Sequence, residues 1–127
     1  MKLVDTSCWV HQLRSRGDKD IRDRVNNLLL AGEAAWCPPV RLELWAGVGN
    51  EAERRILREY EQVIPELPVT DAVWQKACDL AHIGRRNGMS LPVTDLLVYA
   101  CAAENGVEIE HADRHFAEMA RIDRYKA

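Results

Sequence analysis

Four carboxylates lie where the predicted strands and helices of this chain begin or end, and carboxylates in such places can bind a metal ion. They are Asp5, Glu43, Asp95 and Asp113. Asp5 follows a short apolar run at residues 2–4, and Asp113 comes shortly after an alternating run at residues 107–110. Because sites in open parallel sheets form at the carboxyl ends of the strands, we expect these carboxylates to lie close together.

Each of the four carboxylates also has an ordinary structural explanation. Asp5 could cap the helix that follows it, and Asp95 could complement the positive end of a helix, which contributes roughly 0.3–1 kcal/mol. Glu43 could be a solvated helix residue, and Asp113 could form a turn. Taken singly, these explanations are the more common ones, so only the four residues together indicate a site.

The sequence around two of the carboxylates is too apolar for ordinary surface residues. Glu43 lies between Leu42 and Leu44, and Asp95 begins the most apolar helix that we expect in the chain. A carboxylate at the edge of a core is costly unless another group compensates its charge, and converging carboxylates also repel one another. A divalent cation removes both penalties, and ligation by oxygen alone is typical of Mg²⁺ or Mn²⁺.

The elements that would position these residues are short strands interleaved with longer helices. The expected strands cover residues 2–4, 34–37 and 107–110. The expected helices start at or just after Ser7, Asp18, Pro38, Asn50, Thr70, Thr94 and Asp113. This alternation predicts an α/β fold in which helices flank a small, mainly parallel sheet.

Composition and charge restrict the class of protein. The 127 residues are 47% hydrophobic and 29% charged, as expected for one globular domain over residues 1–127. The net charge of −3 argues against a general basic nucleic-acid coat, although a metal-loaded acidic site could still act on a nucleic acid. No leader sequence or bilayer-spanning apolar run is evident, so we expect a cytoplasmic protein without a membrane partner. The four widely spaced cysteines are expected to be free thiols, mostly buried.

Four segments of the chain resemble the motif blocks of PIN-domain ribonucleases, and in particular of the VapC toxins of toxin–antitoxin pairs. The segments are "LVDTSCWV", "PPVRLELWAG", "LPVTDLLVYACAAENG" and "EIEHADRHF". They occur in the family's order and cover nearly the whole chain. The resemblance implies a PIN-like fold with three α/β/α layers, and a toxin that inhibits translation or growth by cleaving RNA.

The resemblance also implies roles for single residues. Asp5, Glu43, Asp95 and Asp113 match the family's acidic positions, which gather one or two Mg²⁺ or Mn²⁺ ions whose bound water cuts the RNA. Of these, Glu43 would hold an outer water or act as the base. Cleavage of this kind leaves a 5′-phosphate and a 3′-hydroxyl. The family's partners imply a cognate antitoxin protein and a homodimer of the toxin.

The chain departs from the family pattern at two histidines. His111 occupies a position that is often Thr or Ser, and His115 occupies one that is acidic in some members, which makes a two-metal site doubtful. The two histidines also have the spacing of a zinc pair, but nothing nearby completes such a site. We therefore expect His115 to lie exposed, where it could touch phosphate.

Several residues near the four segments are candidates for contact with RNA. Thr6 and Ser7 resemble the family's small polar pair, and Arg41 and Arg114 neighbour the acidic residues, where a guanidinium could bind phosphate or stack on a base. Any one of these arginines could equally be paired with a glutamate. The tryptophans are expected to pack in the core rather than stack on bases: Trp9, Trp36, Trp45 and Trp74.

Two other functions stay open on the sequence. One is a metal-dependent phosphatase or phosphoacceptor on a similar sheet, although Ser7 stands where a phosphatase would have its second aspartate. The other is a catalytically silent PIN-like module that only binds a partner, although all four carboxylates are present.

Overall fold

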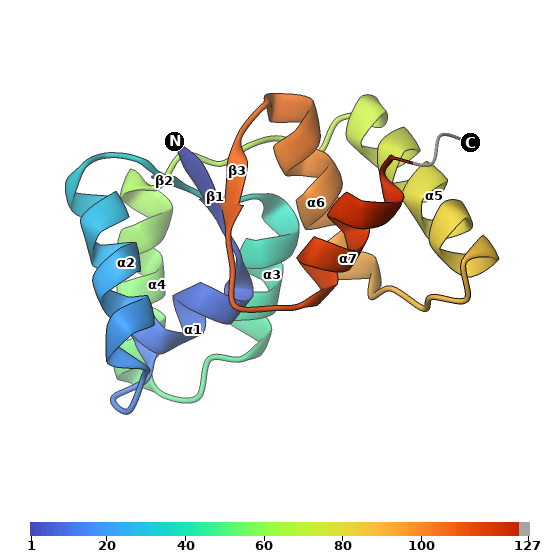
Figure 1. Cartoon of the computed structure of the whole chain (residues 1–127). Helices are drawn as coiled ribbons and strands as arrows, with labels where there is room; N and C mark the ends of the chain where they lie inside the picture. Colours follow the sequence, from blue (N-terminus) through green and yellow to red (C-terminus); the bar gives the residue numbers. More distant parts are fainter. Residues whose placement is uncertain (125–127) are drawn as a thin grey trace.

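The computed structural model of the chain describes residues 1–124 and has a three-stranded parallel sheet at its centre (Figure 1). The strands are β1 (Lys2–Val4), β2 (Ala34–Ala35) and β3 (Glu108–Glu110). Their order is β2-β1-β3, and Leu3 of β1 pairs with Ala35 on one side and Ile109 on the other. Beyond β2, a single parallel bridge joins Trp36 to Glu66. The predicted parallel sheet is therefore confirmed, with the second strand shorter than expected.

Seven helices surround this sheet within the described residues. They are α1 (Thr6–Leu13), α2 (Lys19–Leu30), α3 (Pro38–Ala46), α4 (Glu51–Val63), α5 (Asp71–Arg86), α6 (Val93–Asn105) and α7 (His115–Ile122). In Figure 1, α1, α2 and α4 gather on one side of the strands and α5, α6 and α7 on the other. Helix α3 contacts α1, α4 and α6, so it joins the two groups. The α/β fold class predicted from the sequence is confirmed.

Side-chain caps fix the starts of three helices as the sequence predicts. The carboxylate of Asp18 accepts a hydrogen bond from the backbone N–H of the third residue after it, and so does the amide oxygen of Asn50. The hydroxyl of Thr70 does the same for α5. Such caps satisfy donors that the helix itself leaves free, typically at about 1 kcal/mol each. Helix α6 ends at Gly106, whose φ of 65° is readily adopted only by glycine.

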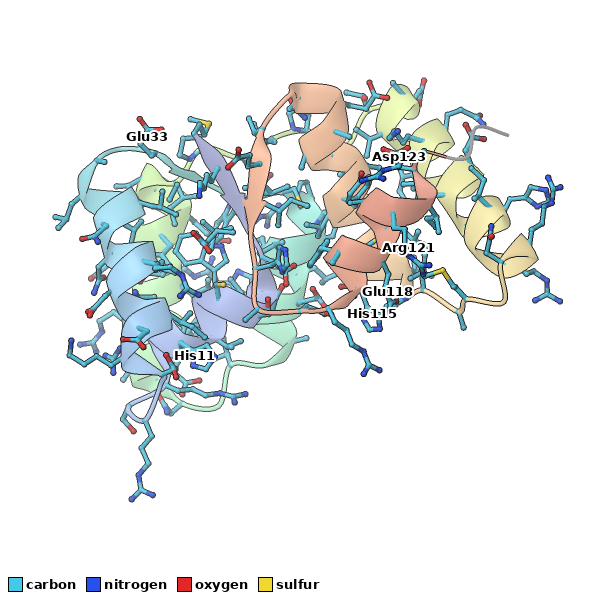
Figure 2. All side chains as sticks on the ribbon, viewed as in Figure 1. His11, Glu33, His115, Glu118, Arg121 and Asp123 are labelled. Carbon is cyan, nitrogen blue, oxygen red and sulfur yellow. The ribbon has the colours of Figure 1, made fainter. Side chains whose placement is uncertain are left out.

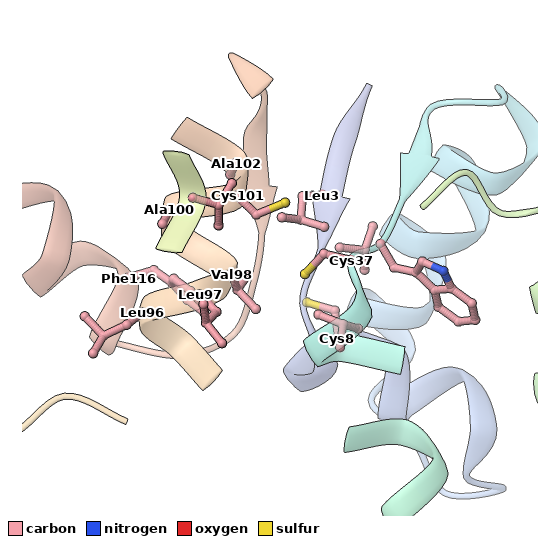
Figure 3. Close-up of a cluster of buried hydrophobic side chains, with 14 of the residues drawn as sticks. Leu3, Cys8, Cys37, Leu96, Leu97, Val98, Ala100, Cys101, Ala102 and Phe116 are labelled. Atoms are coloured by element: carbon pink, nitrogen blue, oxygen red, sulfur yellow. The ribbon is translucent and has the colours of Figure 1, made fainter. Parts of the chain in front are cut away.

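The core lies between β1 and the helices on either side of it. Leu3, Cys37 and Cys101 lie near one another there (Figure 3), and all three are fully buried. Cys8 is also buried, and burial raises the pKa of its thiol to about 11. The prediction of mostly buried, free thiols is thus confirmed, with Cys78 the exposed one.

The tryptophans divide between core and surface. Trp9 and Trp36 are buried and pack edge to face, with ring centres 6.0 Å apart. Trp45 is half-buried and donates a hydrogen bond to Glu61. Trp74 is 51% exposed, so its predicted place in the core is wrong. Among residues 1–124, no helix combines the length and the apolar character needed to cross a membrane.

Candidate active site

Asp5 lies at the carboxyl end of the central strand and has two structural roles. Its backbone N–H donates to the carbonyl of Glu110, at 2.9 Å, which continues the pairing of β1 with β3. Its Oδ2 accepts hydrogen bonds from the backbone N–H and the hydroxyl of Ser7, so Asp5 also caps α1. The capping explanation is therefore correct, but it accounts for only one of the two carboxylate oxygens.

The other oxygen of Asp5 is buried without a partner. The residue is only 3% exposed, and its Oδ1 has no hydrogen-bond partner among the described residues. A buried polar atom left in this way costs on the order of 1–3 kcal/mol, and more when it is charged. This oxygen therefore suits a cation or a bound water as its partner.

Ser7 ties Asp5 to the loop that follows β3. The hydroxyl of Ser7 donates to Asp5 Oδ2 at 2.7 Å, and Ser7 Oγ accepts a hydrogen bond from the backbone N–H of Ala112 at 3.0 Å. Because that loop carries Asp113, Ser7 connects two candidate carboxylates that are far apart in the sequence. In this structure, Ser7 is therefore a positioning residue for the candidate site.

Asp95 stands in the first turn of α6 and is 8% exposed. Burial, followed by the negative charges of Asp113 and Asp5, raises its pKa from 3.8 to about 6. These influences outweigh the stabilising effect of His115 on the ionised form. Asp5 and Asp113 are thus both close enough for their charges to act on Asp95.

His115 joins Asp95 to Asp113 at the start of α7, where Figure 2 labels it. Its Nδ1 lies 3.0 Å from Asp95 Oδ2 and 3.0 Å from Asp113 Oδ1. Its backbone N–H also donates to Asp113 Oδ1, at 2.9 Å. Burial tends to raise the pKa of Asp113, but the hydrogen bonds and charge of His115 prevail and hold that pKa below its ordinary value.

The structure corrects the expectation for His115 and places His111 elsewhere. The side chain of His115 is 27% exposed and lies between two carboxylates, so it is not the freely exposed residue expected from the sequence. The ring of His111 instead packs on Phe116, with ring centres 4.9 Å apart. The one group of potential metal-binding side chains found in residues 1–124 consists of Asp95, Asp113 and His115. It leaves His111 out, so the two histidines form no zinc pair there.

Glu43 is oriented by two threonines from other elements. Thr6 Oγ1 donates to Glu43 Oε1 at 2.8 Å, and Thr94 Oγ1 donates to Oε2 at 3.3 Å. Thr94 was expected to cap α6, but Pro92 occupies that position, and Thr94 lies inside the helix. Its hydroxyl is therefore available to Glu43. The sequence offered one hint of this role, since Thr94 directly precedes Asp95.

The two candidate arginines differ in what they contact. Arg41 Nε lies 2.6 Å from Glu66, and a second nitrogen lies 3.7 Å from Glu61. The hydrogen bond that Arg41 donates to Glu66 raises the pKa of Arg41, as expected for an ion pair. Arg41 is therefore bound to glutamates, the alternative that the sequence left open. Arg114 is exposed at the N-terminus of α7, beside Asp113.

A comparison with protein families identifies the family of this α/β fold. The sequence profile described as "PIN domain" matches residues 2–122. The chain belongs to the PIN-domain family. Ribonuclease VapC11 of Mycobacterium tuberculosis is 31% identical to this PIN domain over 131 residues, covering 100% of the chain and 97% of the relative.

Solved structures share the PIN fold with this chain. Mycobacterium tuberculosis VapC20, described as a sarcin–ricin loop cleaving toxin, aligns with a TM-score of 0.69 at 17% identity, over 93% of this chain and 94% of that one. VapBC-5 of the same organism, a member of the VapBC family of toxin–antitoxin systems, aligns with a TM-score of 0.65 at 18% identity. That alignment covers 93% of this chain and 89% of the other.

The PIN-domain residues present fit a divalent cation. Asp95, Asp113 and His115 each offer one donor atom, and these atoms all lie within 4.8 Å of one another. Asp5 lies outside that tight group, but its charge acts on Asp95 and its Oδ1 is unpaired. A cation would stabilise the ionised form of Asp95 and could offset the burial of Asp5.

Proposed function

We propose that this chain is a metal-dependent endoribonuclease, the toxin of a toxin–antitoxin pair, which acts as a single domain in the cytoplasm and uses Mg²⁺ or Mn²⁺. The proposal is supported chiefly by the close approach of Asp95 and Asp113 to His115 in a PIN domain. The charge of Asp5 acts on the same group, and one oxygen of Asp5 is buried and unpaired. The proposed ribonuclease activity is the one that gives relatives such as ribonuclease VapC11 their name.

The carboxylates would divide the work between binding the ion and moving a proton. Asp5, Asp95 and Asp113 would hold the ion. When bound, a divalent ion lowers the pKa of a coordinated water and neutralises charge on a phosphate. Glu43, held at both oxygens by threonine hydroxyls, would accept the proton of the attacking water. Hydrolysis would leave a 5′-phosphate and a 3′-hydroxyl.

Contacts to RNA would come from the exposed residues around the acidic group. Arg114 is the stronger candidate, because it is exposed beside Asp113. Arg41 would have to leave Glu66 before it could bind a phosphate. The hydroxyl of Thr6 already donates to Glu43, so it would contact RNA while keeping that hydrogen bond.

The partners of this toxin would be a cognate antitoxin and a second copy of the chain. The antitoxin proposal draws on the likeness to VapBC-5, a member of a family of toxin–antitoxin systems. The homodimer is proposed from the family resemblance, and light scattering of the purified protein tests it. No feature of the described residues favours the phosphatase or the silent binding module over the nuclease.

Substitution of Asp5 tests the proposed activity. Asp5→Asn keeps a side chain that can cap α1 but removes the charge at the buried oxygen, so we expect loss of RNA cleavage by about a hundredfold or more with the fold retained. The assay follows end-labelled RNA with Mn²⁺ or Mg²⁺ present. Asp20→Asn, at an exposed site on α2, is the matched control. Full activity of Asp5→Asn, or release of phosphate from small phosphoesters without RNA cleavage, would reject the proposal.

A further inference from the structure

The position of His115 suggests more than a hydrogen bond between neighbours. Its Nδ1 is equally distant, at 3.0 Å, from one oxygen of Asp95 and one oxygen of Asp113. The backbone N–H of His115 also holds Asp113, so the histidine and this carboxylate move together. The imidazole therefore faces the same small volume as the two carboxylates.

Two separations among these atoms match those between neighbouring ligands of one ion, and all three atoms lie within 4.8 Å of one another. In an octahedral site with ligand distances of about 2.1 Å, neighbouring ligand atoms lie about 3.0 Å apart. Nδ1 lies at that separation from both Asp95 Oδ2 and Asp113 Oδ1. Without an ion, Nδ1 forms a hydrogen bond with Asp95 Oδ2 and lies in contact with Asp113 Oδ1. With one, Nδ1 would offer its lone pair and the ring proton would sit on Nε2.

A separate observation indicates that a ligand belongs here. Asp5 is 3% exposed, and its unpaired Oδ1 belongs to a carboxylate whose charge acts on Asp95. Native proteins seldom leave such an atom without a partner. The hydrogen bonds among Asp95, Asp113 and His115 do not involve this oxygen, so it is available to a ligand.

From this geometry we propose that His115 binds the divalent ion directly through Nδ1, which gives the site a mixed nitrogen–oxygen ligand set that prefers Mn²⁺ to Mg²⁺. This inference rests on the metal dependence in the proposed function. It differs from the all-oxygen site expected from the sequence. Mg²⁺ is bound chiefly by oxygen, whereas imidazole suits first-row transition metals, whose affinities for a given site vary with the ion.

If His115 sets the preference for Mn²⁺ over Mg²⁺, a single substitution of this residue should reverse that preference. His115→Asp restores an oxygen ligand and adds a negative charge, so it should strengthen Mg²⁺ binding relative to Mn²⁺. We expect the ratio of the two dissociation constants to shift by about tenfold or more. His115→Gln removes the nitrogen ligand without adding charge, and it should weaken Mn²⁺ binding.

Pulsed electron paramagnetic resonance of the Mn²⁺-loaded protein tests the contact itself. Echo-envelope modulation from a directly bound ¹⁴N is expected in the native protein and in the control His82→Gln, because His82 is exposed on α5. It should be absent from His115→Gln and His115→Asp. Calorimetric titration of each variant with Mn²⁺ and Mg²⁺ gives the ratio of affinities, and circular dichroism checks that each variant is folded.

The possible outcomes separate this inference from the function on which it rests. Mn²⁺ that binds the native protein without ¹⁴N modulation would reject His115 as a ligand and leave the nuclease proposal standing. Modulation that persists in His115→Gln would reject it as well. Absence of any Mn²⁺ binding, together with RNA cleavage in the presence of chelator, would overturn both.

Discussion

Substitution of Asp95 by Asn should stabilise the metal-free protein at neutral and alkaline pH. The fold raises the pKa of Asp95 from 3.8 to about 6, chiefly through burial and then through the charges of Asp113 and Asp5. Folding therefore disfavours the ionised carboxylate. Asparagine has nearly the same shape and no charge, so it removes this disadvantage.

The magnitude follows from linkage between proton binding and folding. A carboxyl whose pKa is raised by roughly two on folding destabilises the native state by about 3 kcal/mol once it is ionised in both states. The penalty is absent below about pH 3.8, grows as the pH rises, and is complete above about pH 6. Weakening of the hydrogen bond from His115 should cost about 1 kcal/mol. The net gain for Asp95→Asn at pH 8 is then about 2 kcal/mol.

Urea denaturation in the presence of EDTA measures this gain. Native protein, Asp95→Asn and the exposed control Asp20→Asn are compared at pH 8 and pH 5, and a smaller pH dependence is expected for Asp95→Asn alone. Addition of Mn²⁺ should reverse the order, because a bound ion stabilises only the protein that keeps its ligands. A metal-free Asp95→Asn that is less stable than native at pH 8 would refute the reasoning.

Two further substitutions test how the site is positioned. Thr94→Val removes one of the two hydroxyls that orient Glu43, so it should lower the rate of RNA cleavage about tenfold. The affinity for Mn²⁺, measured by calorimetry, should stay within twofold of the native value. An unchanged cleavage rate would show that Thr6 alone suffices to orient Glu43. Ser7→Ala breaks the link between Asp5 and the backbone of Ala112, so urea denaturation should show a free energy of unfolding lower by about 1–3 kcal/mol. A decrease of less than about 0.5 kcal/mol would contradict the positioning role of Ser7.

The sequence predicts the first strand and several helix starts well because apolar runs and caps are local features. Asp5 follows β1 as expected, and Asn50 and Thr70 cap their helices. The parallel sheet and the family were also within reach of the sequence, and both are confirmed. The order of the strands was not predicted. The metal-binding roles of the four carboxylates stay predictions.

The features that the sequence did not predict depend on contacts between distant elements. Thr94 turns to Glu43 only because Pro92 takes over the start of α6 and α3 packs against α6. The position of His115 follows from the turn after Asp113, where the backbone brings the ring onto two carboxylates. Trp74 fits the apolar face of a helix by spacing, but the fold leaves it 51% exposed.

The central place of β1 in the sheet has a consequence for when the protein can fold during its synthesis. Its neighbour β3 is synthesised about a hundred residues later, and the bond from Ala112 to Ser7 spans 105 positions in the chain. Contacts so far apart close only after the intervening chain has been made. A growing polypeptide therefore lacks the complete acidic group until residue 115 is free to fold, and the nuclease that we propose cannot cut RNA before that moment.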